Sequence, residues 1–409
     1  MPAINLYLHI HQPFRYRKYT AFDIGNDSNY WDDKQYISKQ NNERIFKKVA
    51  AKSYHPTLDL LEKNLKRFPG FKFSLSITGV WLEQAEKWDY ALIKQLQRIV
   101  ATGRVEIVAE TYYHSLAFFY DLDEFEDQVA LHRAKIKQLF HVEPRVFRNT
   151  ELAYNDNLAK WAEKAGYKGI LAEGWDKILE WRSPNHIYRP HGCTKLKLLL
   201  KNYRLSDDIA FRFSDRCWSE WPLNVPKYHN WLEVDSLRGP LINLFMDFET
   251  FGEHQWESSG IFDFFNGLIA SWLKKPDNKF VTATEACEMM EPAGEISMPQ
   301  TVTWADTERD LTAWTGNSMQ KEASKTLYSY REDILKSNDP EIIKDFRRLT
   351  TSDHVYYMCT KYWNDGDVHA YFSAYDSPYD AALYFTNILR DLKFRYSHGE
   401  AATGRHPNI

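Results

Sequence analysis

The feature that most constrains the fold is a regular alternation of strand and helix patterns through the first 290 residues. Apolar stretches that predict strands occur at residues 4–13, 71–79, 105–110, 144–151, 170–172, 195–203 and 241–247. Stretches with leucines at helical spacing separate the first of them, at residues 55–70, 92–103 and 121–140. Alternation of this kind favours a parallel sheet, and this many repeats favours a barrel.

The pattern changes after Pro292, where the remaining stretches have helical character. Helices are predicted at residues 318–337, 340–363 and 377–397. The expected architecture is therefore α/β, with a barrel over residues 1–290 and a helical C-terminal domain over residues 291–409.

Composition narrows the class of protein. The formal net charge of −4 argues against a nucleic-acid partner, which would need a basic surface. The aromatic fraction is 15%, which suits either sugar binding or an aromatic-rich core. The 4 cysteines form no CxxC pair, and no apolar run is long enough for a membrane span. We expect a soluble cytoplasmic protein with no membrane contact.

Acids and histidines follow the predicted strands at the point where each strand ends. In β/α barrels the active site is built from residues at the carboxyl ends of the strands, so these side chains should converge although they are remote in sequence. The residues concerned are His9, His11, Glu110, His114, Glu151, Glu173, Asp247 and Glu249. Any single one of them could instead simply face water.

Two kinds of chemistry fit such a cluster. Paired carboxylates among aromatic side chains suit glycoside hydrolysis, in which one carboxylate attacks the sugar or activates water and the other protonates the leaving oxygen. A metal site is the less favoured alternative, because a histidine pair two residues apart is a weak signal by itself. Its ligands would be His9, His11, His114, Asp247 and His254.

The order of several motifs makes the chain resemble the α-amylase-type members of glycoside hydrolase family 57. The motifs are HQP at 11–13, GVWLEQ at 79–84, FRNTELAYND at 147–156, MDFETFGEHQW at 246–256 and TWADTERDLTAWTGNSMQ at 303–320. The stretch TSDHVYYM at 351–358 is also similar to that family. Each motif is weak alone, but their order and spacing span nearly the whole chain.

The resemblance implies an incomplete (β/α)7 barrel, a helical domain that completes the cleft, and a retaining mechanism on α-glucans without a metal or cofactor. By position in the motifs, Glu151 matches the nucleophile and Asp247 matches the general acid/base. Substrate contacts are expected at His9, His11, Glu83, His114, Trp256, Trp304, Asp306 and His354.

The leading hypothesis is an α-amylase-type hydrolase that cleaves α-1,4-glucosidic bonds. A 4-α-glucanotransferase or branching enzyme is the alternative on the same scaffold, and a non-catalytic glucan-binding protein or a metal-dependent deacetylase are readings from other classes. For a retaining enzyme we expect Glu151 to be ionised and held by hydrogen-bond donors. We expect Asp247 to have a raised pKa through burial among Phe248, Phe251 and Trp256.

Overall fold

The computed structural model describes residues 2–33, 38–361 and 372–402, with the side chains of 399–402 left out. The chain divides into two compact units. The first, here called the barrel unit, comprises residues 1–11, 47–110 and 131–304, and the second, the helical unit, comprises residues 12–46, 111–130 and 305–409. Segments 12–46 and 111–130 thus belong to the helical unit, although they lie inside the range predicted for the barrel.

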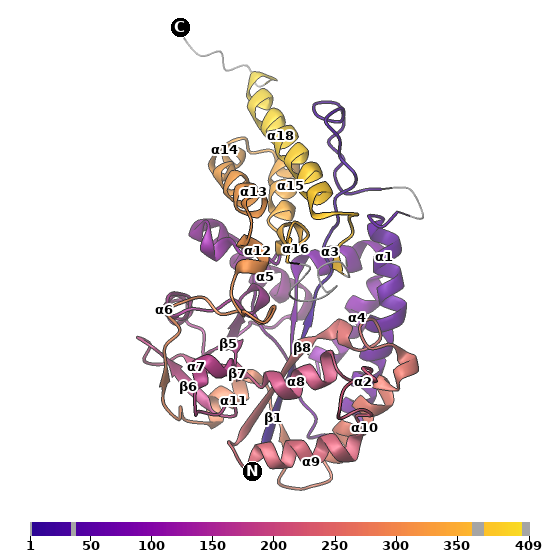
Figure 1. The fold of residues 1–409 in the computed structure, drawn as a ribbon, viewed down its shortest axis with the longest axis vertical. Helices are drawn as coiled ribbons and strands as arrows, with labels where there is room; N and C mark the ends of the chain where they lie inside the picture. The colour runs from indigo at the N-terminus through magenta and orange to yellow at the C-terminus, as the bar shows by residue number, and fades with distance from the viewer. Residues whose placement is uncertain (1, 34–37, 362–371, 403–409) are drawn as a thin grey trace. The chain divides into compact units, whose positions relative to one another are not determined.

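A ring of parallel strands forms the barrel unit (Figure 1). One part of the ring has the order β3-β2-β1-β8, and the other contains β7, β5 and β4. Their bounds are β1 (Ala3–Ile10), β2 (Phe73–Ile77), β3 (Val105–Ile107), β4 (Val146–Arg148), β5 (Gly169–Glu173), β7 (Lys197–Lys201) and β8 (Leu241–Asp247).

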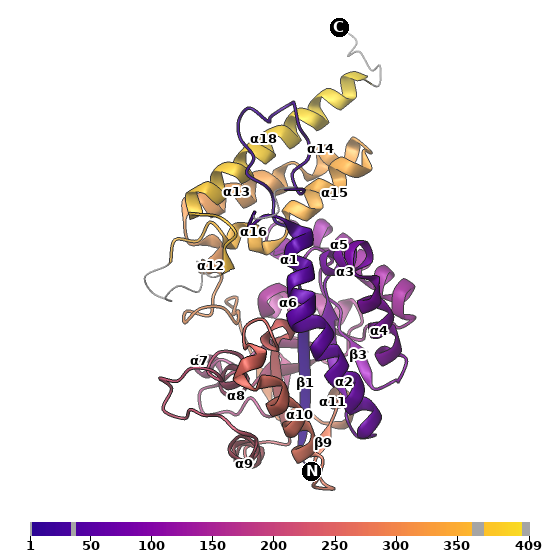
Figure 2. The same cartoon turned by 90° about the vertical axis from the view of Figure 1, so that its right-hand side faces the viewer.

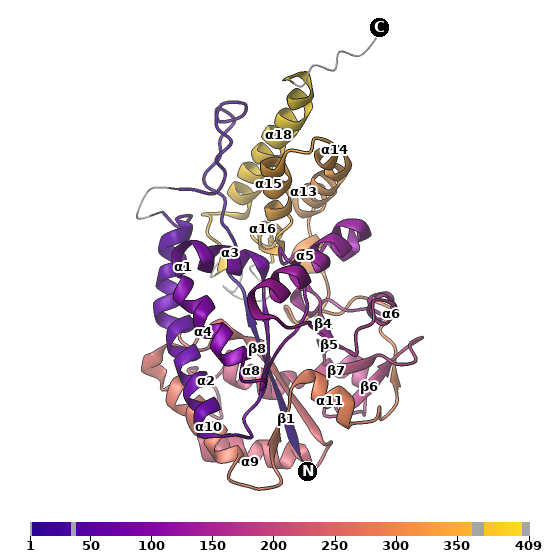
Figure 3. The same cartoon turned by 180° about the vertical axis from the view of Figure 1, so that it is seen from behind.

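Only a few backbone hydrogen bonds join the two parts of the ring. On one side the N–H of Arg148 donates to the carbonyl of Ala109 over 2.8 Å, and on the other the N–H of Asn202 donates to the carbonyl of Asn243 over 2.9 Å. The ring is therefore the incomplete (β/α)7 barrel that the sequence predicted (Figure 3).

Three short strands extend the sheets and were not predicted. The strand β6 (Ile187–Pro190) pairs with β7 in the antiparallel direction, and β10 (Glu295–Ile296) pairs with β6. The strand β9 (Lys279–Phe280) pairs with the beginning of β1. The strands β9 and β10 have two residues and β6 ends at Pro190, so none of them leaves a clear period, whereas the three-residue strands β3 and β4 lie in longer stretches that do.

The core of the barrel lies inside the ring, where β1 is buried at every position. This is expected, because a strand of a parallel barrel is covered on both faces. The polar position Asn5 is accommodated because its side-chain amide donates to Asn243 Oδ1 on β8 over 3.0 Å. On the same pair of strands Tyr7 and Phe245 meet edge to face, with ring centroids 5.4 Å apart.

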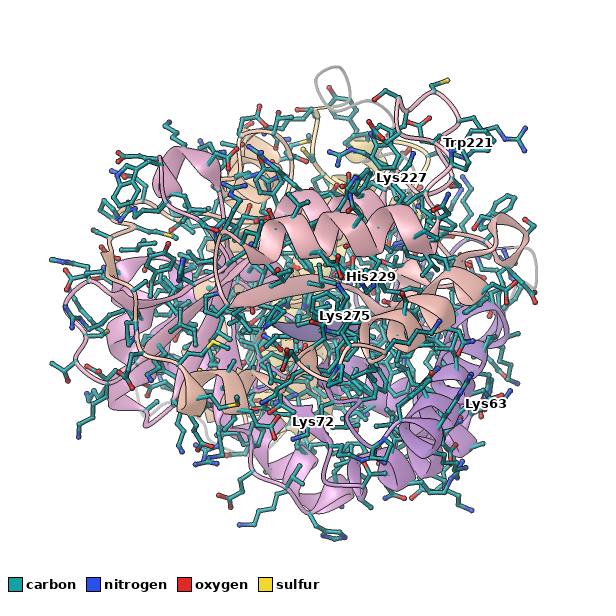
Figure 4. All side chains as sticks on the ribbon, turned by 90° about the horizontal axis from the view of Figure 1, so that it is seen from below. Lys63, Lys72, Trp221, Lys227, His229 and Lys275 are labelled. Carbon is teal, nitrogen blue, oxygen red and sulfur yellow. The ribbon has the colours of Figure 1, made fainter. Side chains whose placement is uncertain are left out.

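Helices cover the outside of the ring (Figure 2). They include α2 (His55–Arg67), α3 (Gly79–Trp88), α4 (Tyr90–Val100), α6 (Asp156–Lys164), α8 (Tyr203–Ala210), α9 (Val225–Ser236), α10 (Ile261–Trp272) and α11 (Ala283–Met289). The helix α9 is tied to α10 and the turn after it, because His229 Nδ1 lies 3.0 Å from the Ser271 hydroxyl of α10 and Glu233 accepts from Lys275 (Figure 4).

The helical unit contains the predicted C-terminal helices, with breaks that the sequence did not reveal. The range 318–337 divides at Tyr330 and the range 340–363 divides at 350–351, and residues 362–363 lie outside the described part of the chain. The helices are α12 (Thr312–Thr315), α13 (Ser318–Ser329), α14 (Arg331–Lys336), α15 (Pro340–Leu349), α16 (Ser352–Tyr356) and α18 (Pro378–Ala402). Among the described helices, none is both long and apolar enough to cross a membrane.

Candidate active site

The carboxyl ends of the barrel strands carry a group of charged side chains, all of them buried except that of Asp247. Because all seven strands of the ring are parallel, these ends lie at one end of the barrel. The group includes His9 on β1, Glu110 after β3, Arg148 on β4, Glu173 on β5, Lys201 on β7 and Asp247 on β8. The convergence that the sequence predicted for acids and histidines is thus present within the barrel unit.

Asp247 ends β8 and pairs in register with His9 of β1. His9 Nδ1 lies 3.5 Å from Asp247 Oδ1, and the Asp247 side chain keeps 38% of its surface exposed. Burial acts to raise the pKa of Asp247, but the hydrogen bond and charge of His9, helped by His254 and Arg148, outweigh it and hold that pKa below its usual value.

The expectation of a raised pKa for Asp247 is therefore wrong for this state of the protein. Phe248 and Phe251 are buried, as expected, but Trp256 is 62% exposed and its ring lies beside Lys52, whose Nζ is 5.4 Å from the ring centroid. Trp256 is thus not part of a buried wall beside Asp247, and the hydrogen bond and charge of His9 outweigh the effect of burial on the pKa of that carboxyl group.

His9 contacts a second carboxylate besides Asp247, that of Glu110. His9 Nε2 lies 3.2 Å from Glu110 Oε2 and 3.4 Å from Arg148 Nη1, and Arg148 Nη1 lies 3.5 Å from the same Glu110 oxygen. All three side chains are buried. Buried charges persist when each has a partner of opposite sign, so this network fixes the ring that contacts Asp247.

Glu151 follows β4 in a short 3₁₀ turn (Thr150–Leu152) and has a left-handed backbone conformation, with φ 59° and ψ 25°. A non-glycine residue in this region costs on the order of 1 kcal/mol or more, and such residues concentrate at functional sites. Two bonds from Trp304 hold it: the indole Nε1–H donates to Glu151 Oε2 over 2.7 Å, and the Trp304 backbone N–H donates to the Glu151 carbonyl over 3.2 Å.

The Trp304 ring itself lies among cations. The Arg148 guanidinium is 5.2 Å and the Lys201 ammonium 5.4 Å from the ring centroid, and the His9 ring meets it edge-on at 6.5 Å. Lys201 Nζ also lies 3.8 Å from the buried carboxylate of Glu173. The sequence analysis did not single out Arg148 and Lys201. The available signal was that each lies at or next to the end of a strand, beside an acid that was predicted for the site.

His11 and Glu249 form a second polar group beside the first. His11 Nδ1 lies 3.0 Å from the Thr78 hydroxyl, and its ring stacks on that of His9 with centroids 5.8 Å apart. Glu249 Oε1 accepts from the Tyr54 hydroxyl over 2.8 Å and from the His11 backbone N–H over 3.4 Å. Burial and the nearby charge of Asp247 raise the pKa of Glu249 well above its usual value.

The remaining candidate residues are placed as follows. Glu83 is half-buried on α3 of the barrel unit, whereas His114, Asp306 and His354 belong to the helical unit. Lys361 Nζ lies 3.5 Å from Asp306 Oδ2. The His354 ring is fully buried, with Nε2 2.8 Å from the Phe14 carbonyl and Nδ1 3.3 Å from the Leu349 carbonyl. This packing does not support a sugar contact by His354, which stays a prediction.

An incomplete (β/α)7 barrel with carboxylates gathered at one end is compatible with a glycoside hydrolase. The family model "Glycosyl hydrolase family 57" matches residues 5–299, and the chain belongs to that family. The resemblance seen in the motifs is thereby confirmed.

Relatives and solved structures agree with this assignment. A protein of Methanocaldococcus jannaschii that is provisionally named alpha-amylase is 42% identical over 398 residues, covering 94% of this chain and 83% of its own length. The crystal structure of the alpha-amylase AmyC from Thermotoga maritima has a TM-score of 0.65 at 12% identity, covering 99% of this chain and 94% of that one. The 4-alpha-glucanotransferase of Thermococcus litoralis has a TM-score of 0.61 at 16% identity, covering 87% of this chain and 56% of that longer chain. These two structures share the fold.

Proposed function

We propose that the protein is a retaining hydrolase of α-1,4-linked glucans, of the α-amylase type. The observation that carries the proposal is that Glu151 and Asp247, at the ends of two strands of one barrel, are each contacted by a nitrogen of a neighbouring ring. Trp304 donates to Glu151 over 2.7 Å, and His9 lies 3.5 Å from Asp247. The centroids of the Trp304 and His9 rings lie 6.5 Å apart, so a continuous series of contacts joins the two carboxylates.

Glu151 serves as the nucleophile in this proposal. Its carboxylate attacks the anomeric carbon, the glycosidic C–O bond breaks, and Asp247 gives its proton to the leaving oxygen. In the second step Asp247 takes a proton from water, the water oxygen attacks the anomeric carbon, and the bond to Glu151 breaks. Donation by the Trp304 N–H suits a nucleophile, because it stabilises the ionised carboxylate.

Asp247 must be protonated to act first as an acid, although His9 holds its pKa low in the free protein. The exposed part of the Asp247 side chain suggests how the carboxyl group becomes protonated when substrate binds. A bound glucan would displace water from the 38% of the side chain that is exposed, and loss of water raises the pKa of a carboxyl group. The His9 contact then favours return of Asp247 to the ionised form that activates water in the second step.

Chemical rescue tests the two roles separately. Glu151→Ala should reduce turnover of maltooligosaccharides at least a hundredfold, and azide should restore turnover with an inverted product, because azide can enter the space that the carboxylate leaves. Asp247→Ala should lose activity on maltooligosaccharides but keep it on glucosides with a good leaving group, which need little protonation. The exchanged pattern would reverse the roles. If the turnover of neither variant fell by more than about tenfold, which corresponds to about 1.4 kcal/mol of activation free energy, neither residue would be catalytic.

The product profile distinguishes hydrolysis from transfer. Hydrolysis and transfer share the first step and differ in the acceptor. If water is the acceptor, wild-type protein incubated with maltoheptaose should give only products that are shorter than the substrate. Products longer than the substrate would identify a glucanotransferase instead.

A further inference from the structure

We infer that Trp304 is a positioning residue for Glu151 and not a stacking platform for sugar rings. The inference rests on the proposed function, because it concerns the carboxylate that we assign as the nucleophile. It replaces the role that the sequence suggested for Trp304, which was direct contact with the substrate.

The first ground is that Trp304 holds Glu151 at two points. The indole N–H fixes one carboxylate oxygen, and the backbone N–H fixes the Glu151 carbonyl. Neighbouring bonds continue this tie, since the N–H of Tyr154 donates to the Val302 carbonyl and the N–H of Val302 donates back, both over 2.9 Å. The segment that carries Trp304 is therefore docked on the turn that carries Glu151, and the carboxylate can swing little without breaking the indole bond.

The second ground is the surroundings of the indole ring. A sugar stacks on an aromatic face that is open to solvent, whereas Trp304 has a guanidinium at 5.2 Å and an ammonium at 5.4 Å from its ring centroid. Cations against a ring draw its electron density toward them, which makes the ring N–H a stronger donor. Trp256 also has an ammonium 5.4 Å from its ring centroid, but 62% of its surface is exposed, so it is the better platform in the barrel unit.

The third ground is the backbone of Glu151. Its left-handed conformation points the side chain in a direction that the local sequence does not favour, so a contact from elsewhere must hold it. Trp304 supplies such a contact from 153 residues further along the chain. A residue that only bound sugar would have no reason to bond the backbone and the side chain of the same residue.

The test replaces the indole N–H while keeping the ring. Trp304→Phe keeps an aromatic face, and benzothienylalanine incorporated at position 304 keeps the whole indole shape with sulfur in place of N–H. We expect each to lower kcat on maltooligosaccharides by about tenfold or more, the size of one lost hydrogen bond to a charged group, with KM changed less than about twofold. The acidic limb of the pH–rate profile should move to higher pH, because the ionised carboxylate loses a donor.

The opposite result would identify a platform. If both variants kept wild-type kcat and pH profile, and Trp304→Ala raised KM instead, the inference would be overturned. Trp272→Phe is the matched control, because it removes an indole N–H bond to the Lys279 carbonyl, over 3.0 Å, at the beginning of β1, and it should leave kcat and the acidic limb unchanged. The benzothienyl variant keeps the test valid if the phenylalanine variant unfolds, because it preserves the volume of the side chain.

The Glu151→Ala variant, with Trp304 unchanged, separates this inference from the proposed function. If azide rescues that variant while the two Trp304 variants behave as wild type, only the positioning role fails. If Glu151→Ala is itself fully active, the proposed function fails first.

Discussion

Glu110→Gln offers the sharpest test of how the charge network supports the site. Glu110 and Arg148 are both fully buried, and their charged atoms lie 3.5 Å apart. At an effective dielectric constant of about 20, two unit charges at that separation attract by roughly 5 kcal/mol. The glutamine keeps the shape of the side chain but removes its charge, so Arg148 is left without this counter-ion. We expect the free energy of unfolding to fall by about 3–5 kcal/mol, the usual cost of breaking a buried ion pair from one side.

Urea unfolding followed by tryptophan fluorescence and circular dichroism measures this loss, and Glu106→Gln provides the control. Glu106 lies on β3, four residues earlier, and accepts from the Thr284 backbone N–H over 2.9 Å and the Ser74 hydroxyl over 3.3 Å. Burial raises the pKa of Glu106, so a neutral amide should cost only about 1 kcal/mol there. Equal losses for the two variants would refute the reasoning, since they would show that the charge of Glu110 contributes nothing.

Three further predictions concern the carboxyl groups of the site. His9 has the largest lowering effect on the pKa of Asp247, and without it only the smaller effects of His254 and Arg148 oppose burial. His9→Gln should therefore raise that pKa and move the alkaline fall of kcat/KM to higher pH; an unchanged profile would contradict this role. Glu249 has a raised pKa and neutral donors, so Glu249→Gln should change the free energy of unfolding by less than about 1 kcal/mol and activity by less than about tenfold, as measured by urea unfolding and maltoheptaose assays. A crystal structure with a bound oligosaccharide should place the Glu151 and Asp247 carboxyl groups about 5–5.5 Å apart, and a separation of about 6.5–9.5 Å would indicate inversion instead.

The barrel was predictable because its signal is local and repeated. Alternation of strands and helices is visible within each short stretch, and the chemistry of parallel strands places their ends together. Glu110, Glu151 and Asp247 could therefore be brought to one end of the barrel from the sequence alone. The short strands β6, β9 and β10 and the break at Tyr330 could not, because these strands do not lie in longer apolar stretches, as β3 and β4 do, and the helical pattern continues across Tyr330.

The electrostatics of the site were not predictable from the same signals. The pKa of Asp247 depends on His9, which lies 238 positions earlier in the chain and becomes a neighbour only through the pairing of β1 with β8. Trp304 was expected to contact substrate because its motif lines the cleft in the family that the chain resembles, and the sequence did not show that its cation neighbours come from β4 and β7. A motif shows which residue types are present, whereas their partners depend on contacts made after the barrel closes.

The bond between Trp304 and Glu151 also has a consequence for the order in which the protein is made. The ribosome synthesises Glu151 long before Trp304. In the same way β1 is synthesised long before β8, the strand with which it pairs. Contacts between residues so distant in sequence form slowly, because a long loop must close before either side gains from it. A nascent chain that ends before residue 304 would lack the partner that orients Glu151, so catalysis would begin only after this segment has emerged and docked.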